Sequence, residues 1–585
     1  MSIPRPEYPR PQFARADWLC LNGPWTYAFD HGRSGDERGL AASNGFSDEI
    51  LVPFCPESAL SGVAHKDFIE RMWYHRAIDI PERWKDKRIL LHFGAVDFDC
   101  SAFIDGRPVG RHYGGSSSFT FDLTGAVSAG ASHHLVVRVA DELRFDLQTG
   151  GKQSTIFESH GCHYTRTTGI WQTVWMEAVP DAGLSSCQII PDVDSGRLIL
   201  VPSFFSRDAA LTFKATLLNG DSPVAVATCP QTSTAPLILD IDSPKLWSPA
   251  HPFLYDLSFE VLDPSGTVID TVASYAGMRK VHIEGSKLFL NNEPVYLRFV
   301  LDQGFYPDGI WTAPTDVALR RDIQLSMRAG FNGARLHQKA FEPRFHYWAD
   351  RLGYLTWGES PSWGIDIWGH DGNHANGPAA WNFFSEWREL VLRDFNSPSI
   401  IAWTPLNETA HGAGGSVHKR FHEDIYALTR ALDPTRPVNE TSGYSHVKTD
   451  LWTVHNYEQD PAKFRSMLTP AEDSGVWRNL PEHEPDYAGQ PYIVDEFGGI
   501  KWVPEDKRPW AADSWGYGAG PRSLDEFYER LKGLVDVLLD LPHVAGYCYT
   551  QLTDVEQEQN GIYNYDRTDK FNMTRIASIF SRNPD

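Results

Sequence analysis

The sequence has few cysteines and comparatively few basic residues. Its seven cysteines are scattered along the chain, odd in number, and never spaced as CxxC. This pattern argues against a disulfide framework and a zinc site, and it favours a reducing compartment. Lys and Arg number 53 against 76 Asp and Glu, which gives a formal charge of -23. Because such a chain repels polyanions, we expect no nucleic acid and no anionic membrane surface as a partner.

Long apolar runs are also missing. No window of 18 consecutive apolar residues occurs, and residues 1–6 contain no apolar segment of the kind found in signal peptides. The sequence therefore predicts a cytoplasmic protein without a membrane span.

The first half of the chain is dominated by short segments in which apolar and polar residues alternate. In residues 1–180 these segments are separated by turn residues, and Asp105-Gly106 is a hairpin signal between two of them. This part predicts a β-sandwich. Residues 181–277 continue the pattern in a smaller unit of about 100 residues, the size of an immunoglobulin-like sandwich. A chain of 585 residues exceeds one hydrophobic core, so several domains are expected.

The pattern changes at about residue 278, where apolar strands begin to alternate with amphipathic helices. Such alternation is the signature of βα units. The candidate strands are 296–301, 333–337, 354–358, 400–406, 437–440, 452–457, 492–496 and 544–552. Helical patterns lie at 316–329, 345–352, 383–394, 417–432 and 525–539. Eight strands in this order predict a (β/α)8 barrel for residues 278–585.

Two of these strands end in a carboxylate. Residues 401–408 form an apolar run that ends in Asn407-Glu408, and residues 491–498 carry Glu496 two positions before Gly498. In a barrel, the C-terminal ends of the strands face one pocket. Glycoside hydrolysis needs two such carboxylates, one to protonate the leaving oxygen and one to attack, or activate water at, the anomeric carbon. We predict Glu408 as general acid/base and Glu496 as nucleophile, about 5 Å apart.

Other strand ends supply hydrogen-bonding residues suited to a sugar. We expect Arg335 and Tyr457 to stabilise the charge of Glu496, and Asn407 to hydrogen-bond the sugar 2-hydroxyl. The remaining candidate substrate-binding residues at strand ends are His337, Asp302, Glu359 and Gln551. The candidate stacking platforms are Trp357, Trp363, Trp368 and Trp502. No thiolate cluster and no HExxH motif occurs, so we predict no metal ion and no cofactor.

Each of these assignments has a purely structural alternative. A glutamate at a strand end is more often solvated or ion-paired than catalytic. Arg335 could simply bridge structural carboxylates, and His337 and His455 could be satisfied core or rim histidines. Each tryptophan could equally fill the core. The spacing of the residues leaves these alternatives open.

Several motifs occur in the order and spacing of a known family. They are Leu21-Asn22-Gly23-Pro24-Trp25, Trp73-Tyr74-His75-Arg76, Thr168-Gly169-Ile170-Trp171-Gln172, Asn332-Gly333-Ala334-Arg335, Asp350-Arg351-Leu352-Gly353, Asn407-Glu408 and Asp495-Glu496-Phe497-Gly498. On these motifs the chain resembles glycoside hydrolase family 2, which includes β-galactosidases, β-glucuronidases and β-mannosidases. The resemblance implies a jelly-roll sugar-binding domain ahead of the other two domains. It also implies a glycoside or oligosaccharide substrate and a retaining double displacement through a glycosyl-enzyme on Glu496. Relatives often form dimers or tetramers, so a homo-oligomer is expected by analogy.

One departure from the family concerns uronic acids. In β-glucuronidases an Asn-x-Lys element near the last strand binds the uronate carboxylate, and the equivalent stretch here, Glu558-Gln559-Asn560-Gly561-Ile562-Tyr563, contains no lysine. An anionic sugar would meet Glu556 and Glu558 unpaired, which disfavours glucuronidase activity.

Other departures concern the rest of the glycone pocket. Many relatives insert an aspartate from a loop of the first domain, and the matching position here is His163. The family's histidine after the second strand is Gln338, and its Asn-x-His-Glu element is replaced by Leu301-Asp302-Gln303-Gly304. We therefore predict an exo-acting glycosidase, β-galactosidase-like or related, for a neutral pyranose or furanose. The alternatives are a β-glucuronidase and a catalytically inactive carbohydrate-binding protein. A lyase or isomerase would need a metal cluster or a catalytic lysine at the strand ends.

Overall fold

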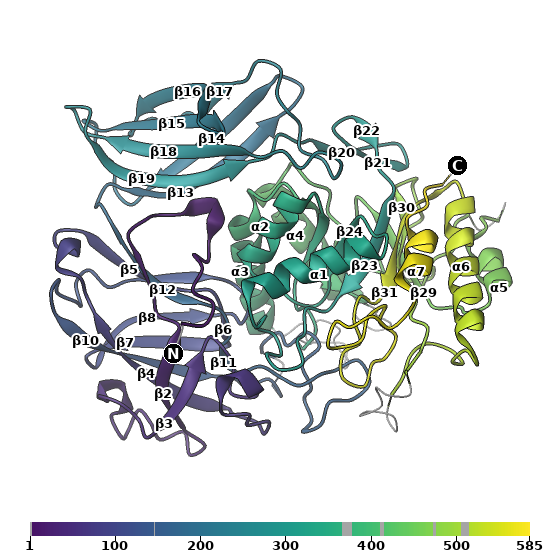
Figure 1. The fold of residues 1–585 in the computed structure, drawn as a ribbon, viewed down its shortest axis with the longest axis horizontal. Coiled ribbons are helices and arrows are strands. Elements are labelled where there is room, and N and C mark those ends of the chain that lie inside the picture. The colour runs from purple at the N-terminus through teal and green to yellow at the C-terminus, as the bar shows by residue number, and fades with distance from the viewer. Residues whose placement is uncertain are drawn as a thin grey trace.

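Two β-sandwiches and a barrel follow one another along the chain, which confirms the predicted fold class (Figure 1). The computed structural model describes residues 3–145, 147–364, 377–409, 415–471, 475–504 and 514–584. In Figure 1 the two sandwiches lie one above the other on the same side of the barrel. Both sandwiches therefore border the barrel.

The first sandwich packs a six-stranded sheet against a four-stranded one. Alternate residues of both sheets face a shared core that includes Trp25, Leu91 and Met176. The larger sheet has the order β3 (Asp48–Val52), β2 (Gly23–Phe29), β4 (Arg71–Asp79), β10 (Ser132–Ala140), β7 (Asp99–Ile104) and β8 (Arg107–Tyr113). The smaller has β1 (Trp18–Cys20), β12 (Val174–Val179), β5 (Arg88–Phe93) and β9 (Phe119–Asp122). The predicted hairpin joins β7 to β8, with φ of 48° at Asp105 and 81° at Gly106.

The second sandwich has a three-stranded and a four-stranded sheet. Its strands keep the alternation seen in the sequence: Phe213, Ala215 and Leu217 are buried, whereas the residues between them are partly exposed. One sheet has the order β13 (Leu184–Asp192), β14 (Arg197–Phe204) and β17 (Leu237–Asp240). The other has the order β16 (Ser222–Pro230), β15 (Thr212–Asn219), β18 (Tyr255–Leu262) and β19 (Val268–Ala276).

Seven parallel strands form the main sheet of the barrel. Their order is β26 (Ile400–Thr404), β25 (Leu355–Glu359), β24 (Gly333–Leu336), β23 (Leu297–Asp302), β31 (Val544–Thr550), β30 (Tyr492–Gly498) and β29 (Trp452–Asn456). The fifth strand was predicted at 437–440. There Val438 makes only an isolated bridge to Trp403, and the regular strand follows as β28 (Thr441–Ser442), paired with β27 (Leu406–Asn407). The predicted segment does pair with β26, because the Trp403 N–H donates to the Pro437 carbonyl over 3.2 Å and the Asn439 N–H donates to the Trp403 carbonyl over 2.9 Å, but the pairing is limited to this bridge.

Helices surround the strands of the barrel (Figure 1). The five predicted helices are present as α1 (Asp316–Arg328), α2 (Pro343–Leu352), α3 (Gly377–Asp394), α4 (Gly415–Leu432) and α6 (Leu524–Asp540). Two short helices were not predicted, α5 (Pro461–Leu468) and α7 (Met573–Phe580). Helix α5 buries only Phe464 and Leu468, and a pattern of two residues is too short to recognise in a sequence.

A small antiparallel sheet links the second sandwich to the barrel. It consists of β20 (Val281–Glu284), β21 (Lys287–Leu290) and β22 (Glu293–Pro294). Leu288 belongs to the same core cluster as Phe299 and Trp357 of the barrel strands. Trp357 is fully buried there, so it fills the core and is no stacking platform.

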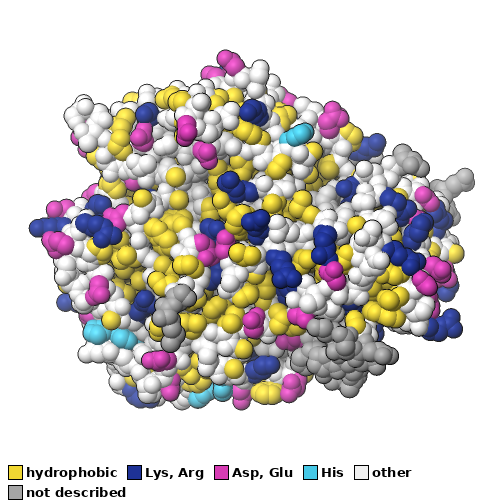
Figure 2. Space-filling view, viewed as in Figure 1, with side chains coloured by type: hydrophobic (Ala, Val, Ile, Leu, Met, Phe, Trp, Pro, Cys, Tyr) yellow, Lys and Arg dark blue, Asp and Glu magenta, His cyan; other side chains and the backbone are white. Residues whose placement is uncertain are grey.

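Lys and Arg side chains are interspersed with Asp and Glu over the face shown in Figure 2. No helix among the residues listed above as described is long and apolar enough to span a membrane.

Candidate active site

Glu408 and Glu496 face each other at the C-terminal ends of the barrel strands. Glu408 directly follows β27, and Glu496 lies within β30. One carboxylate oxygen from each, together with a ring nitrogen of His455, lie within 4.8 Å of one another. Glu408 has φ of 49°, a left-handed backbone conformation that is uncommon for a residue other than glycine. Strands far apart in sequence thus bring together the two predicted glutamates.

Both oxygens of Glu496 accept strong hydrogen bonds. Arg335 Nη1 donates to Oε1 over 2.8 Å, and the Tyr457 hydroxyl donates to Oε2 over 2.5 Å. Burial by itself raises the pKa of Glu496, but His455 and Arg335 outweigh it and hold the pKa well below the usual range. Glu496 is therefore kept ionised.

His455, on β29, connects the two glutamates. Its Nδ1 lies 2.7 Å from Glu408 Oε1 and 3.4 Å from Glu496 Oε2. Its Nε2 lies 3.4 Å from Asp495 Oδ1. Burial lowers the pKa of His455, but Glu496, Asp495 and Glu408 raise it above the ordinary value. The sequence had left this residue open between a satisfied histidine and a ligand.

Arg335 is buried in a network of its own. Its Nε donates to Glu359 Oε2 over 2.6 Å, and its Nη2 lies 2.9 Å from His337 Nδ1. The same Nδ1 lies 3.0 Å from Glu359 Oε1, so this ring nitrogen lies between a guanidinium, which can only donate, and a carboxylate, which can only accept. Burial also drives the pKa of His337 well below its usual value. Glu359 and His337 therefore hold Arg335 in place, while Arg335 both bridges a structural carboxylate and reaches Glu496.

Asn407 presents its amide beside the pair of glutamates. Its Oδ1 accepts from Arg335 Nη2 over 2.5 Å. Since arginine has no acceptor, the oxygen and nitrogen of this amide are assigned without ambiguity. Its Nδ2 is buried and has no hydrogen-bond partner in the described part of the chain. This donor is therefore left for a ligand.

Asp302 and Gln551 are also at strand ends, but their surroundings differ. Asp302 accepts from the backbone N–H of Gly304 over 2.9 Å, and burial followed by the nearby Asp322 raises its pKa to about 6. No hydrogen bond or ion pair among the described residues links Asp302 to Glu408 or Glu496. The Gln551 amide is buried and has no hydrogen-bond partner in the same part of the structure. Contact of either residue with a substrate stays a prediction.

A loop of the first sandwich reaches the barrel pocket. It runs from the end of β10 to β11 (Gly169–Ile170) and contains His163, whose ring lies 5.6 Å from that of Trp363. Burial, then the nearby His160 and Lys152, lower the pKa of His163 to about 4. Lys152 belongs to the same loop and was not predicted. Trp368 lies outside the described residues.

Two tyrosines near the glutamates were also missed. Tyr517 stacks on Tyr457 with ring centroids 3.4 Å apart and an angle of 4° between the planes. The ring of Tyr444 lies 5.9 Å from that of His455, and Glu408 raises the pKa of Tyr444 above its ordinary value. Both tyrosines lie in irregular segments, where neither hydrophobic period nor strand-end position marks a residue.

Glu558 lies in the stretch that was predicted to correspond to the uronate-binding element. It is buried and accepts from the Tyr164 hydroxyl over 2.5 Å and from Asn560 Nδ2 over 3.1 Å. Burial raises its pKa above the ordinary value. Asn560 is thus engaged with a carboxylate of the protein itself.

Glu408, His455 and Glu496 are the one set of three acidic or histidine side chains in the described residues with mutually close donor atoms. A cation at this point would compete with Arg335 and Tyr457 for the oxygens of Glu496. The arrangement suits proton transfer and nucleophilic attack better than metal binding.

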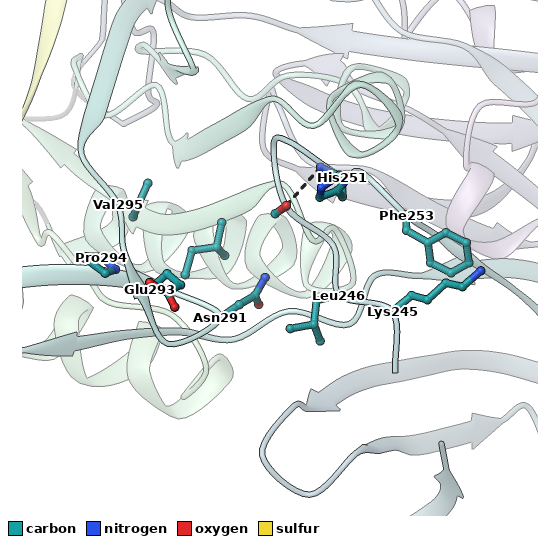
Figure 3. A pocket seen from close by; sticks show the side chains of 10 residues that line it. Lys245, Leu246, His251, Phe253, Asn291, Glu293, Pro294 and Val295 are labelled. Carbon is teal, nitrogen blue, oxygen red and sulfur yellow. Dashed lines mark hydrogen bonds between the residues drawn. The ribbon is translucent and has the colours of Figure 1, made fainter. Parts of the chain in front are cut away.

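A separate cavity of about 730 Å³ lies between the loop at residues 245–253 of the second sandwich and the small sheet of β20 to β22 (Figure 3). It has a mixed lining with one carboxylate and no pair of acidic groups. Its residues are Lys245, Leu246, Ser248, His251, Phe253, Leu290, Asn291, Glu293, Pro294 and Val295. None of the predicted site residues belongs to it.

Two facing glutamates at the strand ends of a (β/α)8 barrel, behind two β-sandwiches, define a class of multidomain proteins built like glycoside hydrolases. Family models identify the group within that class. They match as "Glycosyl hydrolases family 2, sugar binding domain" at residues 61–180, "Glycosyl hydrolases family 2" at 206–279 and "Glycosyl hydrolases family 2, TIM barrel domain" at 281–500. The chain therefore belongs to glycoside hydrolase family 2, as its motifs had indicated.

Curated relatives carry two kinds of name. A β-galactosidase of Aeromonas hydrophila is 28% identical over 400 residues, covering 65% of this chain and 36% of the relative. A β-galactosidase of Thermoanaerobacter pseudethanolicus is 25% identical over 403 residues, covering 66% and 50%. A β-glucuronidase of Paenibacillus borealis is 24% identical over 437 residues, covering 72% of each. The chain thus spans half or less of the two galactosidases.

Solved structures share the complete fold. The β-glucuronidase of Ruminococcus gnavus in complex with D-glucuronic acid superposes with a TM-score of 0.80 at 18% identity, covering 99% of this chain and 100% of that one. The β-D-glucuronidase of Dictyoglomus thermophilum gives 0.78 at 21% identity, covering 99% of both chains. At such identities the likeness establishes the fold alone.

Proposed function

We propose that the protein is a retaining glycoside hydrolase that removes a terminal, neutral glycosyl residue. The observation that carries this proposal is the pair of glutamates: Glu496 is held ionised by His455 and Arg335, and Glu408 faces it with carboxylate oxygens within 4.8 Å. Retaining enzymes keep their carboxyl groups about 5 Å apart, whereas inverting enzymes leave room for a water molecule between them.

In the first step Glu496 attacks the anomeric carbon as Glu408 protonates the departing oxygen. The C–O bond to the aglycone breaks, and a glycosyl ester forms on Glu496. In the second step Glu408 takes a proton from water, the resulting hydroxide attacks the anomeric carbon, and Glu496 leaves as a carboxylate. The charged form of Glu496 is the reactive one, and the low pKa of this group keeps it in that form.

Asn407 has the free donor that the transition state requires. Its Nδ2 has no protein partner in the described residues, and a hydrogen bond from it to the sugar 2-hydroxyl would strengthen as positive charge develops at the anomeric carbon. Arg335 fixes the direction of this amide by binding its oxygen.

The side chains of Glu558 and Asn560 are an argument for a neutral substrate. Asn560 donates a hydrogen bond to Glu558, and neither residue is a cation that could pair with a uronate. Glu558 would instead place a second anion beside the uronate carboxylate. A β-glucuronide is the second candidate, because a curated relative and the two solved structures carry the name β-glucuronidase.

The test is a panel of nitrophenyl glycosides that includes galactosides, galactofuranosides, arabinosides, mannosides and glucuronides. Glu496→Gln should lower kcat on the best substrate by about 1,000-fold or more. Azide should partly restore turnover of an activated substrate by Glu408→Ala, since such a leaving group departs without protonation. A 2-deoxy-2-fluoro glycoside should leave its sugar on the peptide that contains Glu496. A correctly folded wild-type protein that hydrolyses nothing in the panel would support an inactive carbohydrate-binding protein instead.

A further inference from the structure

Lys152 is held at the barrel pocket by its own backbone and by both of its neighbours. The N–H groups of Gly150 and Gly151 donate to the carbonyl of Trp363 over 2.7 and 3.1 Å. A Cβ on Gly151 would lie 2.5 Å from the carbonyl oxygen of Gln338, and its φ is +56°, so the loop can approach the barrel this closely only with glycine there. The carbonyl of Lys152 accepts from the N–H of Tyr164 over 2.7 Å.

The next residue in the loop is fixed as firmly. Gln153 Nε2 donates to Asp97 Oδ2 over 2.8 Å, and its Oε1 accepts from the N–H of Thr167 over 2.6 Å. On the barrel side, Gln557 donates to the carbonyls of Gly161 and His163. The position of Lys152 is therefore set by the packing of the first sandwich on the barrel.

The ammonium group of Lys152 has no protein partner among the described residues, although the residue is only 6% exposed. Its Nζ lies 5.8 Å from the centre of the Trp363 ring. The side chain is thus largely enclosed, but Nζ is not among the buried atoms that lack a partner, so it keeps some solvent access. Water or a ligand in the pocket can therefore complete its hydrogen bonds.

The positive charge of Lys152 affects the pKa of carboxylates on both sides of the pocket. It is among the groups that lower the pKa of Glu496, after His455, Arg335 and His337, and it opposes the burial that raises the pKa of Glu558. Geometry agrees with this location, because the Trp363 indole that Lys152 approaches donates to the carbonyl of Asn407 over 3.2 Å.

We propose that Lys152 is a specificity-determining residue that donates hydrogen bonds to hydroxyl oxygens of a neutral glycone lying between Glu496 and Glu558. This inference rests on the proposed function and names the residue that recognises the sugar. Lys152 supplies up to three donors, and Glu558 uses two of its acceptor sites on Tyr164 and Asn560, leaving others. Adjacent hydroxyl groups both accept and donate, so they match this combination. A carboxylate would satisfy Lys152 but would have nothing to donate to Glu558.

The test compares Lys152→Met, which keeps the length of the side chain, with Lys152→Arg and with Lys463→Met, a control at an exposed lysine of α5. On the best neutral substrate, Lys152→Met should lower kcat/KM by about 100-fold, because a site built to bind a hydroxyl group discriminates strongly. Lys463→Met should leave kcat/KM unchanged. Lys152→Met should unfold at about the same temperature as the wild type, since no hydrogen bond of the described residues depends on Nζ.

Deoxy substrates separate a direct contact from a general effect. Removing the hydroxyl group that Lys152 binds should lower kcat/KM of the wild type but have little further effect in Lys152→Met. If Lys152→Met keeps the wild-type kcat/KM on the neutral substrate, that result would overturn the proposal. So would a wild type that prefers the glucuronide and loses only this activity in the variant, because Lys152 would then bind a carboxylate.

Binding distinguishes failure of this inference from failure of the proposed function. Titrations of the neutral monosaccharides and their lactones are followed by tryptophan fluorescence in Glu496→Gln, with and without Lys152→Met. Affinity for the preferred sugar should fall about 10-fold or more when Lys152 is replaced. An unchanged affinity would overturn the inference even if the wild type proves to be catalytically inactive.

Discussion

The imidazole of His455 lies 2.7 Å from the carboxylate of Glu408 and approaches Glu496 from the same ring nitrogen. Three carboxylates surround this ring, and their combined field raises the pKa of His455 despite its burial. The resulting positive charge in turn contributes to the low pKa of Glu496. His455 therefore couples the two glutamates to each other electrostatically.

Replacing His455 by asparagine should move the acid limb of the pH profile. The variant keeps a donor near Glu408 but loses the imidazolium, so the pKa of Glu496 should rise and kcat/KM should fall at low pH first. We expect kcat/KM at the optimum to drop about 10- to 100-fold. The measurement is kcat/KM against pH on an aryl glycoside, with His483→Asn as control. An acid limb at the wild-type pH would refute a positioning role through charge.

The hydroxyl group of Tyr457 should contribute more to catalysis than its aromatic ring. Tyr457→Phe removes the 2.5 Å hydrogen bond to Glu496 but retains the stack on Tyr517. We expect kcat to fall about 100-fold, the size of a lost charge-stabilising donor, with an unchanged unfolding temperature. Steady-state kinetics on an aryl glycoside measure it. Tyr487→Phe, which removes a hydroxyl bonded to the Gln490 carbonyl, is the matched control and should retain full activity.

Much of the fold could be predicted because its elements are periodic. The strands of the sandwiches alternate, as β15 does with buried Phe213, Ala215 and Leu217, and that period is visible without tertiary information. Helices α5 and α7 were missed because eight residues give too few turns to establish a period. The fifth barrel strand was placed early because its first segment makes only a single bridge, at Val438.

Some residues of the candidate site could likewise be predicted from the sequence, and others could not. Glu408 and Glu496 could be proposed because βα alternation fixes which end of each strand faces the pocket. Lys152 could not, because its place depends on contacts between residues far apart, such as Gly151 with Trp363. Glu359 was predicted to bind substrate, but both of its oxygens serve Arg335 and the Gln338 N–H. A position at the end of a strand indicates that a side chain faces the pocket, but it does not indicate which group that side chain binds.

Arg335 should be as important for stability as for activity. Arg335→Met would leave Glu359 and Glu496 without their buried cation, and we expect a loss of about 3–5 kcal/mol. Arg335→Lys retains the charge but cannot bind two carboxylates in a fork, so its loss should be smaller. Thermal unfolding measures both. Adding Glu359→Gln to Arg335→Met should restore part of the stability, and no restoration would contradict a charge-based account.

Glu386 of α3 should make the contact between the first sandwich and the barrel sensitive to pH. It is buried, and its oxygens accept from the Ser116 N–H over 2.6 Å and the Thr149 hydroxyl over 3.3 Å. Burial raises its pKa from 4.5 to about 7. A raised folded-state pKa contributes stability that is fully present below pH 4.5 and is lost as pH rises through about 7. Glu386→Gln should therefore match the wild type below pH 4.5 and exceed it at pH 8 by on the order of 3 kcal/mol. Unfolding temperatures of both proteins across this range provide the measurement, and a difference that does not grow with pH would exclude Glu386 as the titrating group.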